Sequence, residues 1–189
     1  MRPRRLELRA PRTSHEWDRY HDTRKRCIFD RYHGKGSRYY CEYNPGCPDE
    51  HDPANHPLIF LADGEVIGTI RIDIKAGQCM AVFRLVAIDE PWQGQGLGAI
   101  MLAMAETHAR RLGVDRICLN AVAAAYGFYA RCGFTPSRWD GCTHNDTEIP
   151  VIKLLGETAP SLRGVAHTHR GGGHERRSHA ATGSPSPPF

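Results

Sequence analysis

The chain has 189 residues, of which 40% are hydrophobic, a length and composition that fit one domain with an ordinary core. The formal net charge is +4, and the positive charge gathers near the two ends of the sequence rather than along a groove-like pattern. No stretch approaches the roughly 20 apolar residues of a membrane span, and the basic start MRPRRLELRAPR has no apolar signal segment. We therefore expect a protein that binds neither nucleic acid nor a membrane.

Cysteine usage suggests a reducing compartment. The seven cysteines are odd in number and scattered, and several lie inside apolar segments, where a free thiol packs as a small hydrophobic group. Reduced cysteines indicate a cytoplasmic protein.

The N-terminal part predicts a short strand at Leu6–Ala10 and then a helix over residues 14–29. Thr13 and Glu16 have the spacing of a capping box at the start of this helix. Four residues are expected on its buried face: Trp17, Tyr20, Cys27 and Ile28.

Residues 31–57 show no sustained periodicity and are rich in Tyr, Gly, Pro, His and Cys. So long a connection without secondary structure is typical of a functional lid or a disordered segment. Three tyrosines are expected to shape an acceptor pocket: Tyr39, Tyr40 and Tyr43. A zinc site could be drawn from Cys41, Cys47, His51 and His56. Their spacing fits no familiar zinc motif, so we predict no metal.

The next segment predicts a β-hairpin. Asp63-Gly64 suits a type I′ turn between two β-rich runs. In the second run isoleucines alternate with charged residues, so that Arg71 and Asp73 are expected on the face away from the core. A further strand is predicted over residues 80–89.

Three glycines, Gly94, Gly96 and Gly98, stand where this strand gives way to a predicted helix over 97–112, which Gly113 ends. Glycine allows positive φ and close approach of another molecule. The first turn of a helix also presents unpaired N–H groups and the positive end of the helix dipole. This stretch therefore predicts an anion site, with phosphate as the natural ligand.

The rest of the chain predicts a strand over 116–121, a short helix over 123–132 that Gly133 ends, and a last strand over 148–155. From residue 156 the composition turns to Gly, Ser, Pro, His and Arg, which favours a disordered tail over 156–189.

Three interpretations compete for the glycine stretch. It could be a plain strand-to-helix turn. Gly94-x-Gly96-x-x-Ala99 also fits a dinucleotide-binding pattern, but that pattern needs an acidic residue at the end of the next strand. Here the next strand ends in Leu119-Asn120, and the nearest acid, Asp115, lies at its start.

The third interpretation rests on a longer string. VAIDEPWQGQGLGAIMLAMAE resembles the acyl-CoA motif of the GNAT N-acyltransferase superfamily, with Gln93, Gly96 and Gly98 in its key places. Downstream, LNAVAAAYGFYARCGF resembles the segment that forms the other wall of the CoA cleft, with Phe128-Tyr129 and Gly133-Phe134. The resemblance implies an α/β (α+β) fold over residues 1–155. Its central sheet would be mixed, mainly antiparallel, flanked by helices and splayed into a V at the strand that ends near Ile88.

The resemblance also implies acetyl-CoA as co-substrate, an amine acceptor and direct attack of the amine in a ternary complex, without a metal. The implied cofactor-binding residues are Val86, Ala87, Ile88, Gln93, Gly94, Gln95, Gly96, Leu97, Gly98, Ala99, Asn120 and Tyr129. Tyr129 matches the general acid that protonates the leaving thiolate, with Tyr126, one turn earlier, as a rival.

A general base is harder to identify from the sequence. Asp73 is the first candidate, with Asp89 and Glu90 as others. The alternative for Asp73 is an ion pair with Arg71 on a solvated face. Arg84 could orient an acidic acceptor instead. Two further matters stay open: whether the chain is a monomer or a homodimer, and whether it is a non-catalytic acyl-CoA-binding or interaction module on the same fold.

Overall fold

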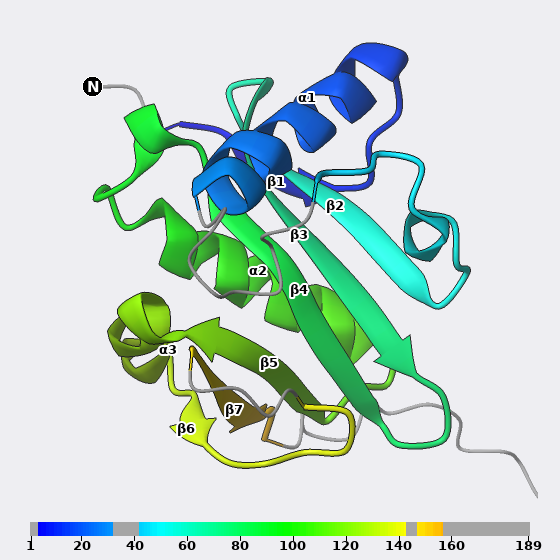
Figure 1. Cartoon of the computed structure of the whole chain (residues 1–189), viewed down its shortest axis with the longest axis vertical. Helices are drawn as coiled ribbons and strands as arrows, with labels where there is room; N and C mark the ends of the chain where they lie inside the picture. Colours follow the sequence, from blue (N-terminus) through cyan, green and yellow to red (C-terminus); the bar gives the residue numbers. More distant parts are fainter. Residues whose placement is uncertain (1–3, 32–41, 143–146, 157–189) are drawn as a thin grey trace, which may run out of the picture. The chain divides into compact units, whose positions relative to one another are not determined.

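A computed structural model describes residues 4–31, 42–142 and 147–156, all within the compact unit Met1–Glu157 (Figure 1). The predicted tail lies outside these residues, so both the tail and the boundary at residue 155 stay predictions. No helix in the described part is long and apolar enough to cross a membrane. The six described cysteines are free.

Seven strands form one sheet in the order β1-β2-β3-β4-β5-β7-β6. Their bounds are β1 Leu6–Arg9, β2 Asn55–Ala62, β3 Glu65–Lys75, β4 Met80–Ile88, β5 Arg116–Val122, β6 Thr135–Pro136 and β7 Glu148–Leu154. Every neighbouring pair is antiparallel except β4 and β5, which are parallel. The predicted mixed, mainly antiparallel sheet is confirmed.

The helices cover both faces of this sheet. The α-helices are α1 Ser14–Arg24, α2 Leu97–Arg111 and α3 Tyr126–Arg131. A π-helix, η1 Lys25–Asp30, continues α1, and short 3₁₀ turns are η3 Pro48–Glu50, η4 Glu90–Trp92 and η5 Ala123–Ala125. The sequence predicted a single helix over 14–29; the structure divides it at Lys25.

Local signals at the predicted turns and helix ends correspond to observed geometry. Asp63 and Gly64 both have positive φ in the β2–β3 turn, as a type I′ turn requires. Gly113 and Gly133 have φ of +80° and +87° just after α2 and α3. At the start of α1, Thr13 Oγ1 accepts from the Glu16 N–H at 3.2 Å. In a capping box the Glu16 carboxylate would accept from the N–H of Thr13. Here it accepts from the N–H of Arg12 instead, at 2.6 Å.

Side chains alternate between two cores. Residues such as Phe60, Ile70 and Ile72 pack against α2 and α3 in the larger core. Their neighbours in sequence point to the opposite face, where Ile59 and Leu61 pack against Tyr20 of α1. We call this second side the α1 face. Period-two alternation therefore decides which residues of β3 and β4 meet α1.

Candidate active site

Strands β4 and β5 separate after a short paired stretch. They pair only at Met80–Val82 with Arg116–Cys118, and beyond these residues the strands diverge, which is the predicted V (Figure 1). A cleft of about 680 Å³ lies along the gap. Its walls come from the second half of β4, the glycine stretch, the start of α2, the end of β5, α3 and η1.

The wall on β4 is irregular at its centre. Between the pairs Thr69–Ala87 and Arg71–Arg84, β4 contains one residue more than β3, which makes a β-bulge. Leu85, in the bulge, has a φ of +54°. Val86, Ala87 and Ile88 all line the cleft.

Backbone alternation decides which groups of β4 face the gap. The Asp89 N–H donates to the Ile67 carbonyl at 2.9 Å, so the backbone groups of this residue face β3. Those of Ile88 then point away from β3 and into the gap. The predicted backbone contact around Ile88 therefore has a suitable edge.

The glycine stretch combines two kinds of constraint. Gly94 and Gly96 have φ of +75° and +77°, and a Cβ on either would meet no atom within 4 Å, so the space beside this backbone is open. Gly98 differs, because a Cβ there would lie 3.2 Å from Cζ of Phe128. Two glycines thus set the backbone and leave room, while the third lets α2 and α3 approach each other.

The start of α2 has the geometry of an anion site. Gly96 is the N-cap residue and offers no side-chain cap. The Ala99 N–H donates to the Gly96 carbonyl at 3.1 Å. The N–H groups of Leu97 and Gly98, earlier in the first turn, have no carbonyl within the helix to pair with, and the positive end of the helix dipole lies beside them. The Gln93 N–H donates to the Glu90 carbonyl at 3.1 Å, so the backbone between Gly94 and Gly98 is the part of the predicted stretch that can hold phosphate groups.

Side chains next to this stretch have other partners. Gln93 Nε2 donates to the Ile88 carbonyl at 2.7 Å. Gln95 accepts from Arg4 Nη1 at 3.0 Å, and the Arg4 guanidinium lies 4.7 Å from the centre of the Trp92 ring. Arg4 is a cation beside the anion site that the sequence did not indicate, because it lies about 90 residues away along the chain.

The wall opposite β4 contains the two residues predicted there, Asn120 and Tyr129. Tyr129 is buried, lines the cleft and makes edge-on contacts with the rings of Phe128 and Phe134. Tyr126 does not line the cleft, which favours Tyr129 over its rival. Asn120, near the end of β5, lines the cleft, and no hydrogen-bond donor of the described residues reaches its buried Oδ1. That atom is suited to an N–H group of a ligand.

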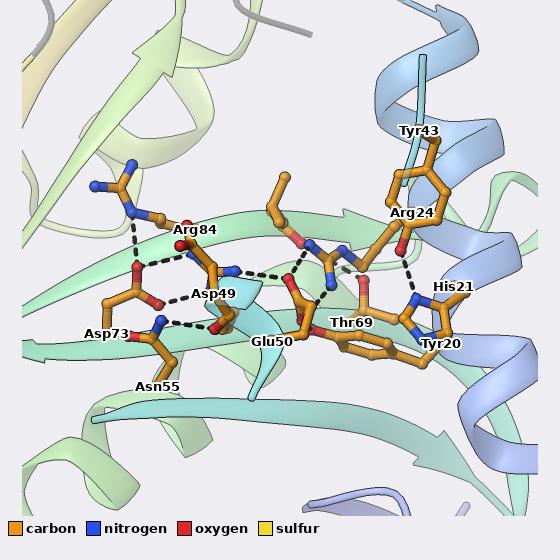
Figure 2. Close-up of polar contacts among 12 residues, drawn as sticks. Tyr20, His21, Arg24, Tyr43, Asp49, Glu50, Asn55, Thr69, Asp73 and Arg84 are labelled. Atoms are coloured by element: carbon orange, nitrogen blue, oxygen red, sulfur yellow. Dashed lines mark hydrogen bonds and ion pairs between the residues drawn. The ribbon is translucent and has the colours of Figure 1, made fainter. Parts of the chain in front are cut away.

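Asp73 occupies a different place from the one expected. Its carboxylate accepts from Arg71 Nε at 2.7 Å and Nη2 at 3.0 Å, and from Arg84 Nε at 2.8 Å (Figure 2). Arg71 and Asp73 are almost fully buried, so the expected solvated face is wrong. The α1 face is covered here because α1 packs over β3 and η3 packs against β2, from which Glu50 reaches Arg71. Asp73 does not line the cleft, and its geometry favours the ion-pair interpretation.

A second buried carboxylate, Glu50 of η3, connects α1 to β3. It accepts from Arg24 Nη1 and Nη2 at 2.7 and 2.8 Å, from Arg71 Nη1 at 2.6 Å and from the Tyr20 hydroxyl at 2.8 Å (Figure 2). Burial alone would raise the pKa of Glu50, but the hydrogen bonds and charges of Arg24 and Arg71 lower it to about 2. Sequence analysis missed Glu50, because nothing local distinguishes it from a loop residue.

Asp89 follows β4 directly and is the third buried carboxylate. It accepts from Arg26 Nη1 at 2.9 Å and Nη2 at 3.1 Å, and Arg19 approaches at 3.4 Å. The hydrogen bonds from Arg26 lower its pKa. The same carboxylate accepts from the Glu90 N–H and begins η4. Asp89 therefore fixes the turn that leads from β4 into the glycine stretch.

The predicted lid is described only in part. Tyr39, Tyr40 and Cys41 lie outside the described residues. Tyr43 packs its ring against Phe29 and its hydroxyl lies 2.6 Å from Nδ1 of His21. Within the described ranges, no three His, Cys, Asp or Glu residues gather as metal ligands.

Comparisons with known proteins give consistent results. The family model of the acetyltransferase (GNAT) family matches residues 14–134. Solved structures with the same fold include the PaiA N-acetyltransferase of Thermoplasma acidophilum in complex with coenzyme A, at 18% identity and a TM-score of 0.62 over 79% of this chain and 99% of that one.

Two further similar structures have names that refer to different molecules. A spermidine N-acetyltransferase SpeG chimera from Vibrio cholerae and hSSAT has 18% identity and a TM-score of 0.61 over 79% of this chain and 95% of that one. N-acetylglutamate synthase from Neisseria gonorrhoeae, complexed with coenzyme A and L-arginine, has 15% identity and a TM-score of 0.62 over 80% of this chain and 34% of that one.

Proposed function

Because this chain belongs to the acetyltransferase (GNAT) family, we propose that it transfers an acetyl group from acetyl-CoA to a primary amine by direct attack in a ternary complex. The observation that carries the proposal is the splayed gap between β4 and β5, since one cleft there holds a backbone anion site at one end and Tyr129 in its wall. From the sequence alone, we further propose that the protein is cytoplasmic and that it is a monomer or a homodimer.

The cofactor fits the cleft by its chemistry. A pyrophosphate needs several N–H donors and no side chain in the way, and the turn at Gly94–Gly98 meets both conditions. We propose that the pantetheine arm follows β4 and pairs with the backbone around Ile88. The PaiA structure in complex with coenzyme A supports this choice of cofactor.

The reaction needs a neutral amine and a proton for the leaving sulfur. The amine nitrogen attacks the thioester carbonyl carbon and gives up one proton to water, the C–S bond breaks, and CoA leaves as a thiolate. Backbone donors on β4 stabilise the charge that develops on the carbonyl oxygen. We propose that the Tyr129 hydroxyl protonates the thiolate, since a phenol is protonated at neutral pH and this one lines the cleft.

Asp73 is better suited to holding Arg84 than to accepting the proton of the amine. A base needs a free oxygen within reach of the substrate. Both carboxylate oxygens of Asp73 accept from arginines, and the residue lies outside the cleft. We therefore propose a positioning role for Asp73.

The fold alone does not determine which amine is the acceptor. Similar structures include one named for spermidine and one named for N-acetylglutamate, and their TM-scores to this chain are equal within 0.01. The acceptor must therefore be deduced from side chains.

Two measurements test the proposed function. Acetyl-CoA should raise the melting temperature of the protein by linkage, whereas NAD and NADP should not. Release of free thiol from acetyl-CoA should then depend on an added amine. A shift with NAD alone would exclude the acyltransferase. A shift with acetyl-CoA but no thiol release with any amine would favour a non-catalytic acyl-CoA-binding module.

A further inference from the structure

The charged side chains that line the cleft in the described part of the chain are of one sign. Two charged side chains, Arg31 and Arg131, line it within the described part of the chain, and both are arginines. A polyamine acceptor would need carboxylates to receive its additional ammonium groups. The described lining residues include no carboxylate.

Buried carboxylates do exist on the α1 face, but arginines already occupy them. Glu50 is held by Arg24 and Arg71, and Asp73 by Arg71 and Arg84. Asp89 is held by Arg26 and Arg19. Each carboxylate thus has two guanidinium partners.

Three further carboxylates of the described residues lie near this network without lining the cleft. Asp22 is half-buried and pairs with Arg26, and Asp49 is exposed and pairs with Arg71. Glu90 is exposed, and none of the three lines the cleft.

Arg84 is the arginine at the open end of this network. Its Nε donates to Asp73, while Figure 2 shows its two terminal nitrogens turned away from that carboxylate. Among the described residues, Asp73 is the carboxylate partner of Arg84, and 25% of the Arg84 side chain is exposed. Asp73 therefore fixes the guanidinium and leaves its outer edge available for a second anion.

The position of Arg84 along β4 separates it from the phosphates of CoA. Arg84 precedes Ile88 by four positions, so it is about 13 Å from the end of the strand at the usual rise of a β-strand. Its neighbours in sequence, Phe83 and Leu85, both line the cleft. Arg84 itself does not line the cleft; it lies beside the narrow end of the gap, next to the bulge, and its side chain contacts Asp73 on the α1 face.

We infer that the acceptor is an amine that carries a carboxylate, that Arg84 receives this carboxylate, and that polyamines are poor substrates. The inference rests on the proposed function and names its substrate class. A guanidinium forms paired hydrogen bonds with a carboxylate and thereby orients it. Nearby positive charge also lowers the pKa of the acceptor ammonium, which favours the neutral amine that attacks.

The first experiment compares acceptors on the full-length protein by thiol release from acetyl-CoA. Amino acids are compared with their amides at equal concentrations of neutral amine, and spermidine is added to the set. We expect kcat/KM to be at least about tenfold higher for the acids than for the amides, the effect of one charge-assisted hydrogen bond. Spermidine or the amides matching the acids would overturn the inference and leave the acetyltransferase intact. No release with any amine overturns both.

The second experiment changes Arg84. In Arg84→Gln, kcat/KM for the carboxylated amine should fall by about ten- to a hundredfold. The value for its amide, and the Kd of acetyl-CoA, should change by less than about threefold. Arg84→Lys should recover part of the loss because it keeps the charge, and Arg111→Gln, an exposed arginine on α2, serves as the control.

The ratio of acid to amide within one variant does not depend on how much of the protein is folded. An equal fall for acid and amide in Arg84→Gln contradicts the inference. A weaker binding of acetyl-CoA in that variant also contradicts it, since Arg84 would then serve the cofactor.

Discussion

The two sides of β4 bind charge in opposite ways. On the cofactor side, the turn Gln93–Ala99 offers backbone N–H groups and space, with no charged side chain of its own. On the α1 face, Glu50, Asp73 and Asp89 are buried among arginines from α1, η1, β3 and β4. The first site is made of backbone from one short segment; the second is made of side chains from several segments that are far apart in the sequence.

This difference has energetic consequences. A backbone anion site brings no charge of its own, so its ligand can leave without stranding a buried ion. A buried ion pair is different, because removal of one partner leaves the other charge without compensation. Substitutions on the cofactor side should therefore change binding more than stability. Those on the α1 face should do the reverse.

The largest expected effect concerns Glu50. Glu50→Gln keeps the shape of the side chain but leaves Arg24 and Arg71 without their shared anion. We expect the free energy of unfolding to fall by about 3–5 kcal/mol, measured by urea denaturation. Asp49→Asn, at the neighbouring residue, should cost less than about 0.5 kcal/mol, since its side chain is 68% exposed. A loss below about 1 kcal/mol for Glu50→Gln would mean that the network does not hold α1 and η3 to the sheet.

Acid should remove the same contribution from the unchanged protein. The pKa of Glu50 is lowered to about 2 from an ordinary 4.5, so the folded state binds fewer protons than the unfolded state between these values. Stability from this carboxylate is complete above about pH 4.5 and is lost as the pH falls toward 2. The difference in unfolding free energy between wild type and Glu50→Gln should shrink over this range. A difference that does not depend on pH would contradict the assignment.

On the cofactor side, Gly96→Asp should raise the Kd of acetyl-CoA at least about a hundredfold, a change of roughly 2.7 kcal/mol. The new carboxylate would occupy the open space and repel the pyrophosphate. Isothermal titration measures the Kd. Gly77→Asp, in the β3–β4 turn, provides a matched control because its φ is also positive, at +74°, and its Cβ would also meet open space. Equal weakening in both variants would attribute the effect to backbone strain alone.

Tyr129→Phe tests chemistry within the same cleft. It retains the ring and its packing on Phe128 and Phe134 but removes the proton donor. Turnover should fall about a hundredfold, with little change in the Kd of acetyl-CoA. Tyr126→Phe should have much less effect, because Tyr126 does not line the cleft. Turnover of Tyr129→Phe within about twofold of wild type, with chemistry rate-limiting, would assign the proton to another group.

Gly98→Ala should have the smallest effect. Its Cβ would lie 3.2 Å from Phe128 Cζ, so α3 must shift by a few tenths of an ångström. We expect a stability loss of about 1 kcal/mol or less and less than a tenfold change in the Kd of acetyl-CoA. A loss of binding as large as that of Gly96→Asp would show that all three glycines face the cofactor.

The sequence by itself determined the features that depend on contiguous residues. The Asp63-Gly64 hairpin, α2 with its stop at Gly113 and the glycine stretch before it all follow from φ preferences and hydrophobic period over about 15 residues or fewer. The splayed sheet was implied by the resemblance of two motifs to the GNAT superfamily, not by these local preferences. The local features could be predicted because backbone preferences of contiguous residues do not depend on the rest of the chain.

The tertiary structure alone decided the chemistry of the α1 face. Arg24, Glu50 and Arg71 are 21 to 47 residues apart, and each by itself is an ordinary charged residue. Gly98 and Phe128 are also far apart in the sequence, and their contact gives Gly98 a packing role that Gly94 and Gly96 do not have. The sequence placed Asp73 on the correct face of its strand but could not reveal that α1 and η3 cover that face. Burial depends on which distant segments pack together, and a charge changes its role according to burial, from a solvated side chain to one that must be paired.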